Sequence, residues 1–190
     1  MELKFFIIGL RRSGTSLFRN LILKSPNIKT ILFEPHEILH AVSLLKIKRY
    51  QNSKYHENTI KKFKQLPGIS GAKFALNPGI DAMDWVWLSK SFPQAKFLFI
   101  SRNVGSNYKS YHKADVKTFR GVIPKDIYKP FHGVMNAGFE KFHAAHPKAS
   151  AVLKYDNILS DVDSEMQKAW NLLGVKSPRS LKSMIKQPEN

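Results

Sequence analysis

Apolar residues form four short runs along this chain, each the length of a strand and too short for a core helix. The runs are rich in β-branched, leucine or aromatic residues, which is typical of strands buried on both faces of a parallel sheet. The predicted strands are Leu3–Ile8, Ala72–Leu76, Lys96–Ser101 and Ala151–Tyr155.

Segments with a helical spacing of apolar residues lie between these runs. The first follows Thr15 and ends before Ser25-Pro26. Further helices are predicted at Ile80–Ser91, Val104–Ala114, Ile127–Ala145 and Asp161–Leu173. Gly174 is a suitable stop for the last helix, and residues 41–70 are predicted to be basic and helical, ending at the Pro67-Gly68 turn. Strands that alternate with helices predict a three-layer α/β fold with a central parallel sheet, in a single domain over residues 1–190.

Composition narrows the classes of function. The 190 residues carry a formal net charge of +17 and no cysteine, which excludes disulfides, zinc fingers and a cysteine nucleophile. Such a charge attracts polyanions or serves solubility, and both interpretations stay open. The basic residues are dispersed without interleaved aromatics, so we expect no nucleic-acid partner. The apolar runs are too short to cross a bilayer and the amino-terminal pattern is unlike a signal peptide, so we expect a cytoplasmic protein.

The stretch "FIIGLRRSGTSLFRNLI" combines a predicted strand, a turn that contains Gly14, and a helix. Such a turn directs free backbone N–H groups and the helix dipole toward an anion. Gly9 and Gly14 have the spacing of a nucleotide-hydrolase phosphate loop, but Thr15 stands where that loop needs its lysine. The strand Lys96–Ser101 is followed by arginine, not by the aspartate that a magnesium-dependent enzyme needs there. The loop therefore predicts an anion site that is a poor fit to a kinase or ATPase.

The residues "RRSGTS" resemble the 5′-phosphosulfate loop of the sulfotransferases that use 3′-phosphoadenosine 5′-phosphosulfate (PAPS). The resemblance implies a P-loop NTPase-like sulfotransferase fold. It also implies that Arg12, with Arg11 nearby, neutralises charge on the leaving 5′-phosphate. The implied phosphate cradle consists of Ser13, Gly14, Thr15 and Ser16.

A second stretch, "FPQAKFLFISRNVGSNYKSYH", resembles the 3′-phosphate site of the same family. Arg102 at the strand end and Ser110 on the next helix take the family's arginine and serine places, and a guanidinium fork suits a terminal phosphate. A third stretch, "VLKYDNILSDVDSEMQKAWNLLGV", resembles the family's last strand, turn and helix, and we interpret Asp156-Asn157 as structural. Leu17 stands where one branch has tryptophan and the late Arg-Lys-Gly segment is absent, so adenine contacts are unassigned.

The family also implies a catalytic base. Ala75 stands where the small-molecule branch has histidine, whereas glycan-type and many bacterial members use a glutamate after the first helix. In "ILFEPHEIL" we predict Glu34 as the base and His36 as the second candidate, with Glu37 still open. Lys73 either bridges the transferring sulfonate or extends to the surface.

The implied activity is transfer of a sulfuryl group from PAPS to a hydroxyl or amine, with 3′-phosphoadenosine 5′-phosphate (PAP) as product and no metal. The acceptor is expected to be an anionic glycan or a small molecule. Two alternatives remain: a P-loop kinase of small metabolites, and a non-catalytic basic protein that binds polyanions.

Overall fold

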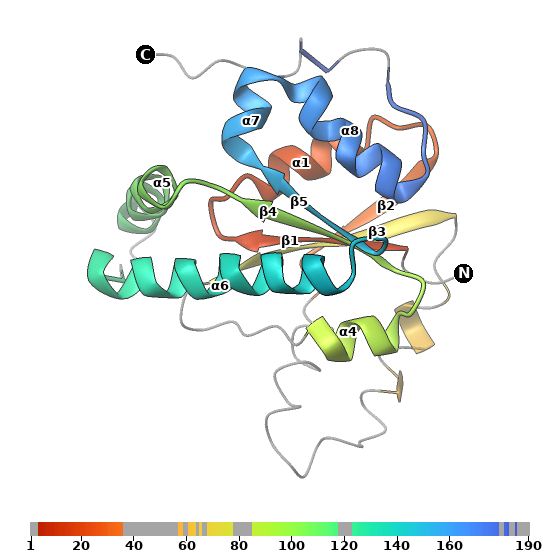
Figure 1. Ribbon diagram of the computed structural model, residues 1–190, viewed down its shortest axis with the longest axis horizontal. Coiled ribbons are helices and arrows are strands. Elements are labelled where there is room, and N and C mark those ends of the chain that lie inside the picture. Colours follow the sequence, from red (N-terminus) through yellow and green to blue (C-terminus); the bar gives the residue numbers. More distant parts are fainter. Residues whose placement is uncertain are drawn as a thin grey trace.

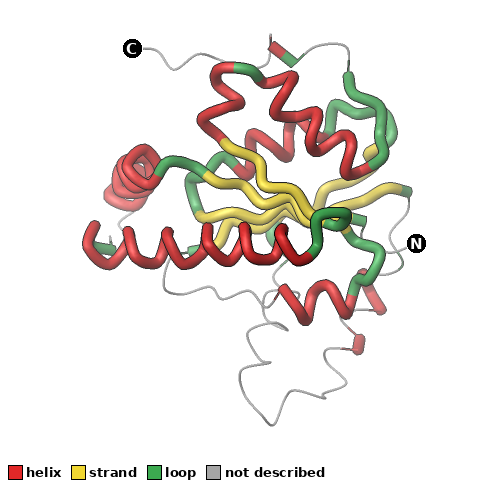
Figure 2. Tube along the Cα trace, in the orientation of Figure 1, coloured by secondary structure: helices red, strands yellow, loops and turns green. Residues whose placement is uncertain are grey.

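A central sheet of parallel strands organises the molecule (Figures 1 and 2). The structure is a computed structural model that describes residues 4–35, 57–58, 61–63, 65, 68–77, 85–117, 123–178, 181–182 and 185. The strands are β1 (Phe5–Leu10), β2 (Ile28–Phe33), β3 (Ile69–Leu76), β4 (Lys96–Ser101) and β5 (Ser150–Lys154). Their order across the sheet is β2-β3-β1-β4-β5, and each pairing is parallel. The predicted α/β class with a central parallel sheet is confirmed.

Helices cover both faces of this sheet, which makes three layers (Figure 1). The helices are α1 (Thr15–Ile22), α4 (Trp85–Ser91), α5 (Val104–Lys117), α6 (Lys125–Ala145), α7 (Tyr155–Ser160) and α8 (Val162–Leu173). Helices α1 and α8 lie on one face, and α4 and α6 lie on the other (Figure 1). Every residue of β1 is buried, as a central strand covered on both faces requires.

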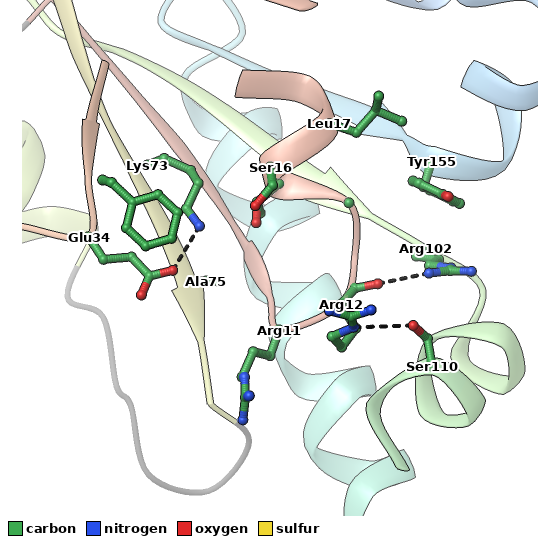
Figure 3. A pocket seen from close by; sticks show the side chains of 13 residues that line it. Arg11, Arg12, Ser16, Leu17, Glu34, Lys73, Ala75, Arg102, Ser110 and Tyr155 are labelled. Atoms are coloured by element: carbon green, nitrogen blue, oxygen red, sulfur yellow. Dashed lines mark hydrogen bonds and ion pairs between the residues drawn. The ribbon is translucent and has the colours of Figure 1, made fainter. Parts of the chain in front are cut away.

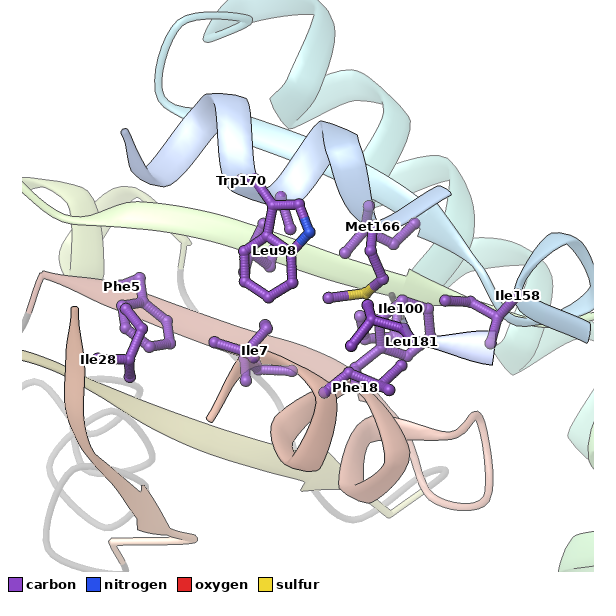
Figure 4. Close-up of a cluster of buried hydrophobic side chains, with 14 of the residues drawn as sticks. Phe5, Ile7, Phe18, Ile28, Leu98, Ile100, Ile158, Met166, Trp170 and Leu181 are labelled. Carbon is purple, nitrogen blue, oxygen red and sulfur yellow. The ribbon is translucent and has the colours of Figure 1, made fainter. Parts of the chain in front are cut away.

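Alternate residues of the strands supply two separate cores. Phe6 and Ile8 point into a phenylalanine-rich core on the α6 face, where the rings of Phe99 and Phe139 stack with centroids 4.7 Å apart. Phe5 and Ile7 point into the opposite core with α1 and α8 (Figure 4). The two-residue period of a strand sends neighbouring side chains to opposite faces, so one short segment serves both cores.

The predicted elements largely coincide with those observed, and the differences have local causes. The basic segment was predicted to end at the Pro67-Gly68 turn, and β3 begins directly after it at Ile69, earlier than the predicted strand start at Ala72. Ser70 and Gly71 have low strand propensity, but a Cβ at Gly71 would overlap the Phe5 ring, so packing requires glycine there. Most of residues 41–70, and the first turn predicted for α4, lie outside the described residues. The predicted stop of α8 at Gly174 is confirmed, with φ at 62°.

Candidate active site

The turn between β1 and α1 presents the amino terminus of a helix to the carboxyl edge of the sheet. We call residues 11–14 the anion loop. Gly14 is the N-cap of α1 in the left-handed conformation (φ 98°), and no side chain caps the helix there. The first-turn amides of a helix have no carbonyl partner within the helix, and the macrodipole makes this end electropositive. The loop therefore offers backbone donors to an anion.

The ring of Tyr155 closes over this loop. Tyr155 is the first residue of α7, directly after β5, and a Cβ on Gly14 would overlap its ring. The guanidinium of Arg102 lies 4.2 Å from the centroid of the same ring, within cation–π distance. Tyr155 thus packs between the anion loop and the arginine that follows β4. The sequence analysis did not assign Tyr155 to the site. Its place directly after a strand, where ligand-contacting residues gather in parallel sheets, was the available signal.

The two predicted phosphate sites are adjacent in the structure (Figure 3). Nη1 of Arg102 donates to the carbonyl oxygen of Arg12 at 2.9 Å, and Nε of Arg12 donates to Oγ of Ser110 at 3.3 Å. Arg12 has a positive φ of 67°, which is uncommon for a residue with a Cβ. The Arg12 side chain therefore lies toward α5 and Ser110, whereas Nη1 of Arg11 donates to Oδ1 of Asn77 after β3.

Glu34 and Lys73 form an ion pair at the carboxyl ends of β2 and β3 (Figure 3). Nζ of Lys73 lies 2.7 Å from Oε1 of Glu34, and the two side chains are 2% and 26% exposed. The same ammonium lies 3.9 Å from the ring centroid of Phe33, which is itself 62% exposed. Lys73 therefore does not extend to the surface. The ion pair therefore holds the Glu34 carboxylate at the cavity wall, and its role as a base stays a prediction.

A cavity of about 430 Å³ joins these groups. The predicted site residues that line it are Arg11, Arg12, Gly14, Thr15, Ser16, Glu34, Lys73, Arg102 and Ser110. Leu17, Phe33, Ala75 and Tyr155 complete the lining. Among these lining residues the cations outnumber the carboxylates, of which Glu34 is the only one. This electrostatic balance favours an anionic ligand.

One predicted site residue that the structure describes, Ser13, is not part of the cavity lining. Ser13 is buried, and its N–H donates to the carbonyl oxygen of Leu10 at 3.0 Å, so its role as a phosphate ligand stays a prediction. His36 lies outside the described residues, as does Glu37, the third candidate base.

Asp156 and Asn157 lie outside the cavity lining and form hydrogen bonds that hold the backbone around the site. Oδ2 of Asp156 accepts the N–H of Asn103 at 2.9 Å, which holds the backbone next to Arg102. Asn157 donates to the buried carboxylate of Glu165, which also accepts from Lys168 and from the N–H of Lys154. Burial acts to raise the pKa of Glu165, but these hydrogen bonds outweigh it and lower the pKa below its ordinary 4.5.

In the described part of the chain, no group of three or more histidine, cysteine, aspartate or glutamate side chains is placed to hold a metal ion. The helices described are also too short or too polar for any to cross a membrane.

The parallel sheet and the strand–loop–helix anion site define a P-loop-type α/β fold. Among solved structures, the chain is similar to a sulfotransferase from Alicyclobacillus acidocaldarius, with a TM-score of 0.68, 16% identity, and coverage of 99% of this chain and 87% of that one. It is also similar to mouse sulfotransferase SULT7A1 complexed with PAP, with a TM-score of 0.61, 15% identity, and coverage of 96% of this chain but 62% of that one.

A third similar structure is the sulfotransferase domain from the curacin biosynthetic pathway, with a TM-score of 0.59, 13% identity, and coverage of 94% and 76% of the two chains. Shikimate kinase from Bacteroides thetaiotaomicron is similar at a TM-score of 0.52, with 12% identity and coverage of 90% and 98%. No protein-family model and no curated protein matches the sequence. The chain therefore has a sulfotransferase-like P-loop fold.

Proposed function

We propose that this protein is a sulfotransferase that uses PAPS as donor and transfers its sulfuryl group to a hydroxyl or amine of an acceptor. One observation carries the proposal: two anion sites, the anion loop and the pair Arg102 and Ser110, face one cavity. A nucleotide with phosphates at both the 5′ and 3′ positions has the two anions that this arrangement needs. The sulfotransferase-like fold supports the same conclusion.

The residues present fit the donor. The uncapped amino terminus of α1 and the hydroxyls of Thr15 and Ser16 would hold the 5′-phosphate. Arg12, whose Nε donates to Ser110, would add positive charge to the same cavity. Arg102 and Ser110 would hold the 3′-phosphate, because a guanidinium and a hydroxyl are both donors to phosphate oxygen. PAPS supplies an SO₃ group on a phosphate that can leave. The chain's own cations compensate the charge that this phosphate gains.

Glu34 is the proposed base. Its carboxylate faces the cavity and would accept the proton of the attacking hydroxyl or amine. Lys73 holds the carboxylate in place through the 2.7 Å ion pair and adds a positive charge at the same wall. His36 stays the second candidate from the sequence. The excess of cations around the cavity favours an anionic acceptor, either a glycan or a small molecule.

Shikimate kinase shares the fold, which keeps a small-metabolite kinase as the second candidate. Thr15 in the place of the phosphate-loop lysine argues against it, because that lysine reaches the β- and γ-phosphates. Calorimetric titration with PAP and with magnesium-ATP separates the two. We expect PAP to bind more tightly, and a preference for magnesium-ATP would instead establish the kinase.

A charge-matched pair of variants shows whether PAP binds at the proposed place. Arg102→Ala is expected to weaken PAP binding at least tenfold, since a charge-assisted hydrogen bond contributes about 1.5–3 kcal/mol. Lys141→Ala removes the same charge from an exposed position on α6 outside the cavity lining, and we expect no comparable loss. Equal losses in both variants would mean that net charge, not the site, attracts the nucleotide.

The transfer itself is tested with an acceptor panel. Candidate glycans and small molecules incubated with PAPS are analysed by mass spectrometry for the addition of a sulfonate. Glu34→Gln is expected to abolish the addition while PAP affinity is retained, because the amide cannot take the proton. Transfer that persists in Glu34→Gln would move the role of base to another residue, with His36→Ala as the next variant.

A further inference from the structure

Three side chains on α6 form a polar stripe behind the proposed 3′-phosphate site. Tyr128, His132 and Asn136 are spaced four residues apart, so they lie on one side of the helix. Tyr128 is fully buried, and His132 is 7% exposed. None of the three lines the cavity that contains the anion loop. Buried polar groups need hydrogen-bond partners, and each of the three side chains makes at least one hydrogen bond, although Oδ1 of Asn136 is buried without a partner in the structure.

His132 holds the backbone of Arg102. Its Nε2 lies 3.0 Å from the carbonyl oxygen of Arg102, and because a carbonyl only accepts, Nε2 carries the hydrogen. Nδ2 of Asn136 donates to the carbonyl oxygen of His132 at 2.9 Å and lies 3.0 Å from Nδ1 and 3.3 Å from Nε2, so Asn136 packs against the ring. Burial lowers the pKa of His132 below its ordinary 6.5 and so favours the neutral ring. The hydrogen bond to the Arg102 carbonyl acts in the opposite direction but is the smaller effect.

Tyr128 holds α5, the helix that carries Ser110. Its hydroxyl donates to Oδ1 of Asn107, which is fully buried three residues before Ser110. The rings of Tyr108 and Tyr111 pack on the Tyr128 ring, with centroids 5.2 and 5.1 Å away. One helix therefore contacts both elements of the predicted 3′-phosphate site, through Tyr128 on one side and His132 on the other.

The other contacts described near Arg102 involve its guanidinium and the backbone of the next residue, not its own carbonyl. Its guanidinium is oriented by Oγ of Ser106 at 3.2 Å, by the Arg12 carbonyl and by the Tyr155 ring. The backbone of the next residue is held by Asp156. Among the hydrogen bonds described for Arg102, the one from His132 is the contact that fixes its carbonyl to α6.

We propose that His132, held by Asn136, is a positioning residue that acts together with Tyr128 to fix Arg102 relative to Ser110, so that α6 sets the affinity for a 3′-phosphate. The inference rests on the proposed function, because it takes Arg102 and Ser110 as the ligands of that phosphate. It adds a residue that lies outside the lining of the anion-loop cavity and acts on the proposed 3′-phosphate site through Arg102.

The test compares two nucleotides that differ only in the 3′-phosphate, adenosine 3′,5′-bisphosphate and adenosine 5′-phosphate. His132→Phe keeps a ring and removes the hydrogen bond, and we expect it to weaken the bisphosphate about fivefold and the monophosphate less than about twofold. His132→Gln, which keeps a donor, is expected to recover most of the loss. In the Arg102→Ala background, His132→Phe is expected to have no further effect.

A matched control lies on the same helix. Nδ1 of His143 lies 3.2 Å from Oγ of Ser150 at the start of β5. His143→Phe therefore also removes a histidine hydrogen bond, but at the amino ends of the strands, away from Arg102. We expect it to leave the ratio of the two affinities unchanged. Equal weakening of both nucleotides by His132→Phe, or a loss that persists without Arg102, would overturn the proposal.

A ligand-free measurement separates this inference from the proposed function. The ¹Hε–¹⁵Nε signal of Arg102, assigned by its absence in Arg102→Lys, reports the side chain's order by NMR. We expect it to shift or broaden in His132→Phe and to stay in place in His143→Phe. An unchanged signal overturns the positioning role. A wild-type protein without preference for the bisphosphate overturns the proposed donor site, while the NMR result still decides whether His132 positions Arg102.

Discussion

Nζ of Lys73 and Oε1 of Glu34 lie 2.7 Å apart across two neighbouring parallel strands, and the ammonium is buried whereas the carboxylate is partly exposed. Because of this asymmetry, the loss of one partner affects the hydration of the other side chain differently in the two cases. Lys73 has little access to water if the carboxylate is removed, whereas Glu34 can still be hydrated.

Glu34→Ala is therefore expected to lower the free energy of unfolding by about 2 kcal/mol, because it leaves a buried ammonium without its carboxylate. Adding Lys73→Met is expected to recover much of this loss, since the thioether side chain fills similar space without a charge. Urea unfolding of the single and double variants measures both effects. A double variant no more stable than Glu34→Ala would show that Lys73 is well solvated without Glu34.

Gly14→Ala is expected to destabilise the protein by about 1–3 kcal/mol, because the new Cβ overlaps the Tyr155 ring and φ is positive. Gly133→Ala on α6 is the matched control. A Cβ there meets no atom within 4 Å, and alanine should add roughly 1 kcal/mol of helix stability. Thermal unfolding compares the two. If Tyr155→Ala does not relieve part of the Gly14→Ala loss, steric overlap with the ring is not its cause.

Glu165 is expected to make the protein sensitive to acid. Its folded-state pKa is lower than its ordinary 4.5, so the folded protein binds fewer protons than the unfolded chain as the pH falls through that value. The carboxylate therefore contributes stability above pH 4.5 that is lost as the pH falls toward the folded-state pKa. Urea unfolding at several pH values should show a weaker acid dependence in Glu165→Gln. Parallel curves for the two proteins would contradict this.

His132 is expected to make the stability depend on pH in a second, higher range. Its folded-state pKa is also lower than its ordinary 6.5, so the stability present above pH 6.5 decreases as the pH falls below it. Its neighbour Tyr128 does not titrate in this window, because burial raises the pKa of the Tyr128 hydroxyl. In His132→Phe the decrease that begins near pH 6.5 should be absent, whereas His143→Phe should keep it.

The central strands were predictable from sequence, as was the edge strand β5, whereas the other edge strand, β2, was not. β1 and β4 are continuous apolar runs because both of their faces are covered. β2 has several exposed positions at the edge of the sheet, so only its last three residues resembled a strand. The hydrophobic pattern follows burial, and a strand with a solvated face carries less of it.

The residues of the candidate site were likewise predictable only in part. Arg12 and Arg102 belong to local motifs of strand, turn and helix, and the structure brings them together. Tyr155 and His132 belong to no such motif. His132 meets Arg102 across 30 residues of sequence, through the packing of α6 against the end of β4. A contact made by packing two elements has no fixed spacing, so a single sequence gives no sign of it.

The strand order β2-β3-β1-β4-β5 also separates the groups proposed for the acceptor from the groups proposed for the nucleotide donor. Each strand, or the loop directly after it, supplies one group in turn: Glu34, Lys73, the anion loop, Arg102 and Tyr155. Under the proposed function, substitutions in and after β2 and β3 would alter the accepted molecule, whereas the groups proposed to bind the nucleotide, after β1, β4 and β5, would stay intact. The proposed acceptor and donor sites would then evolve independently.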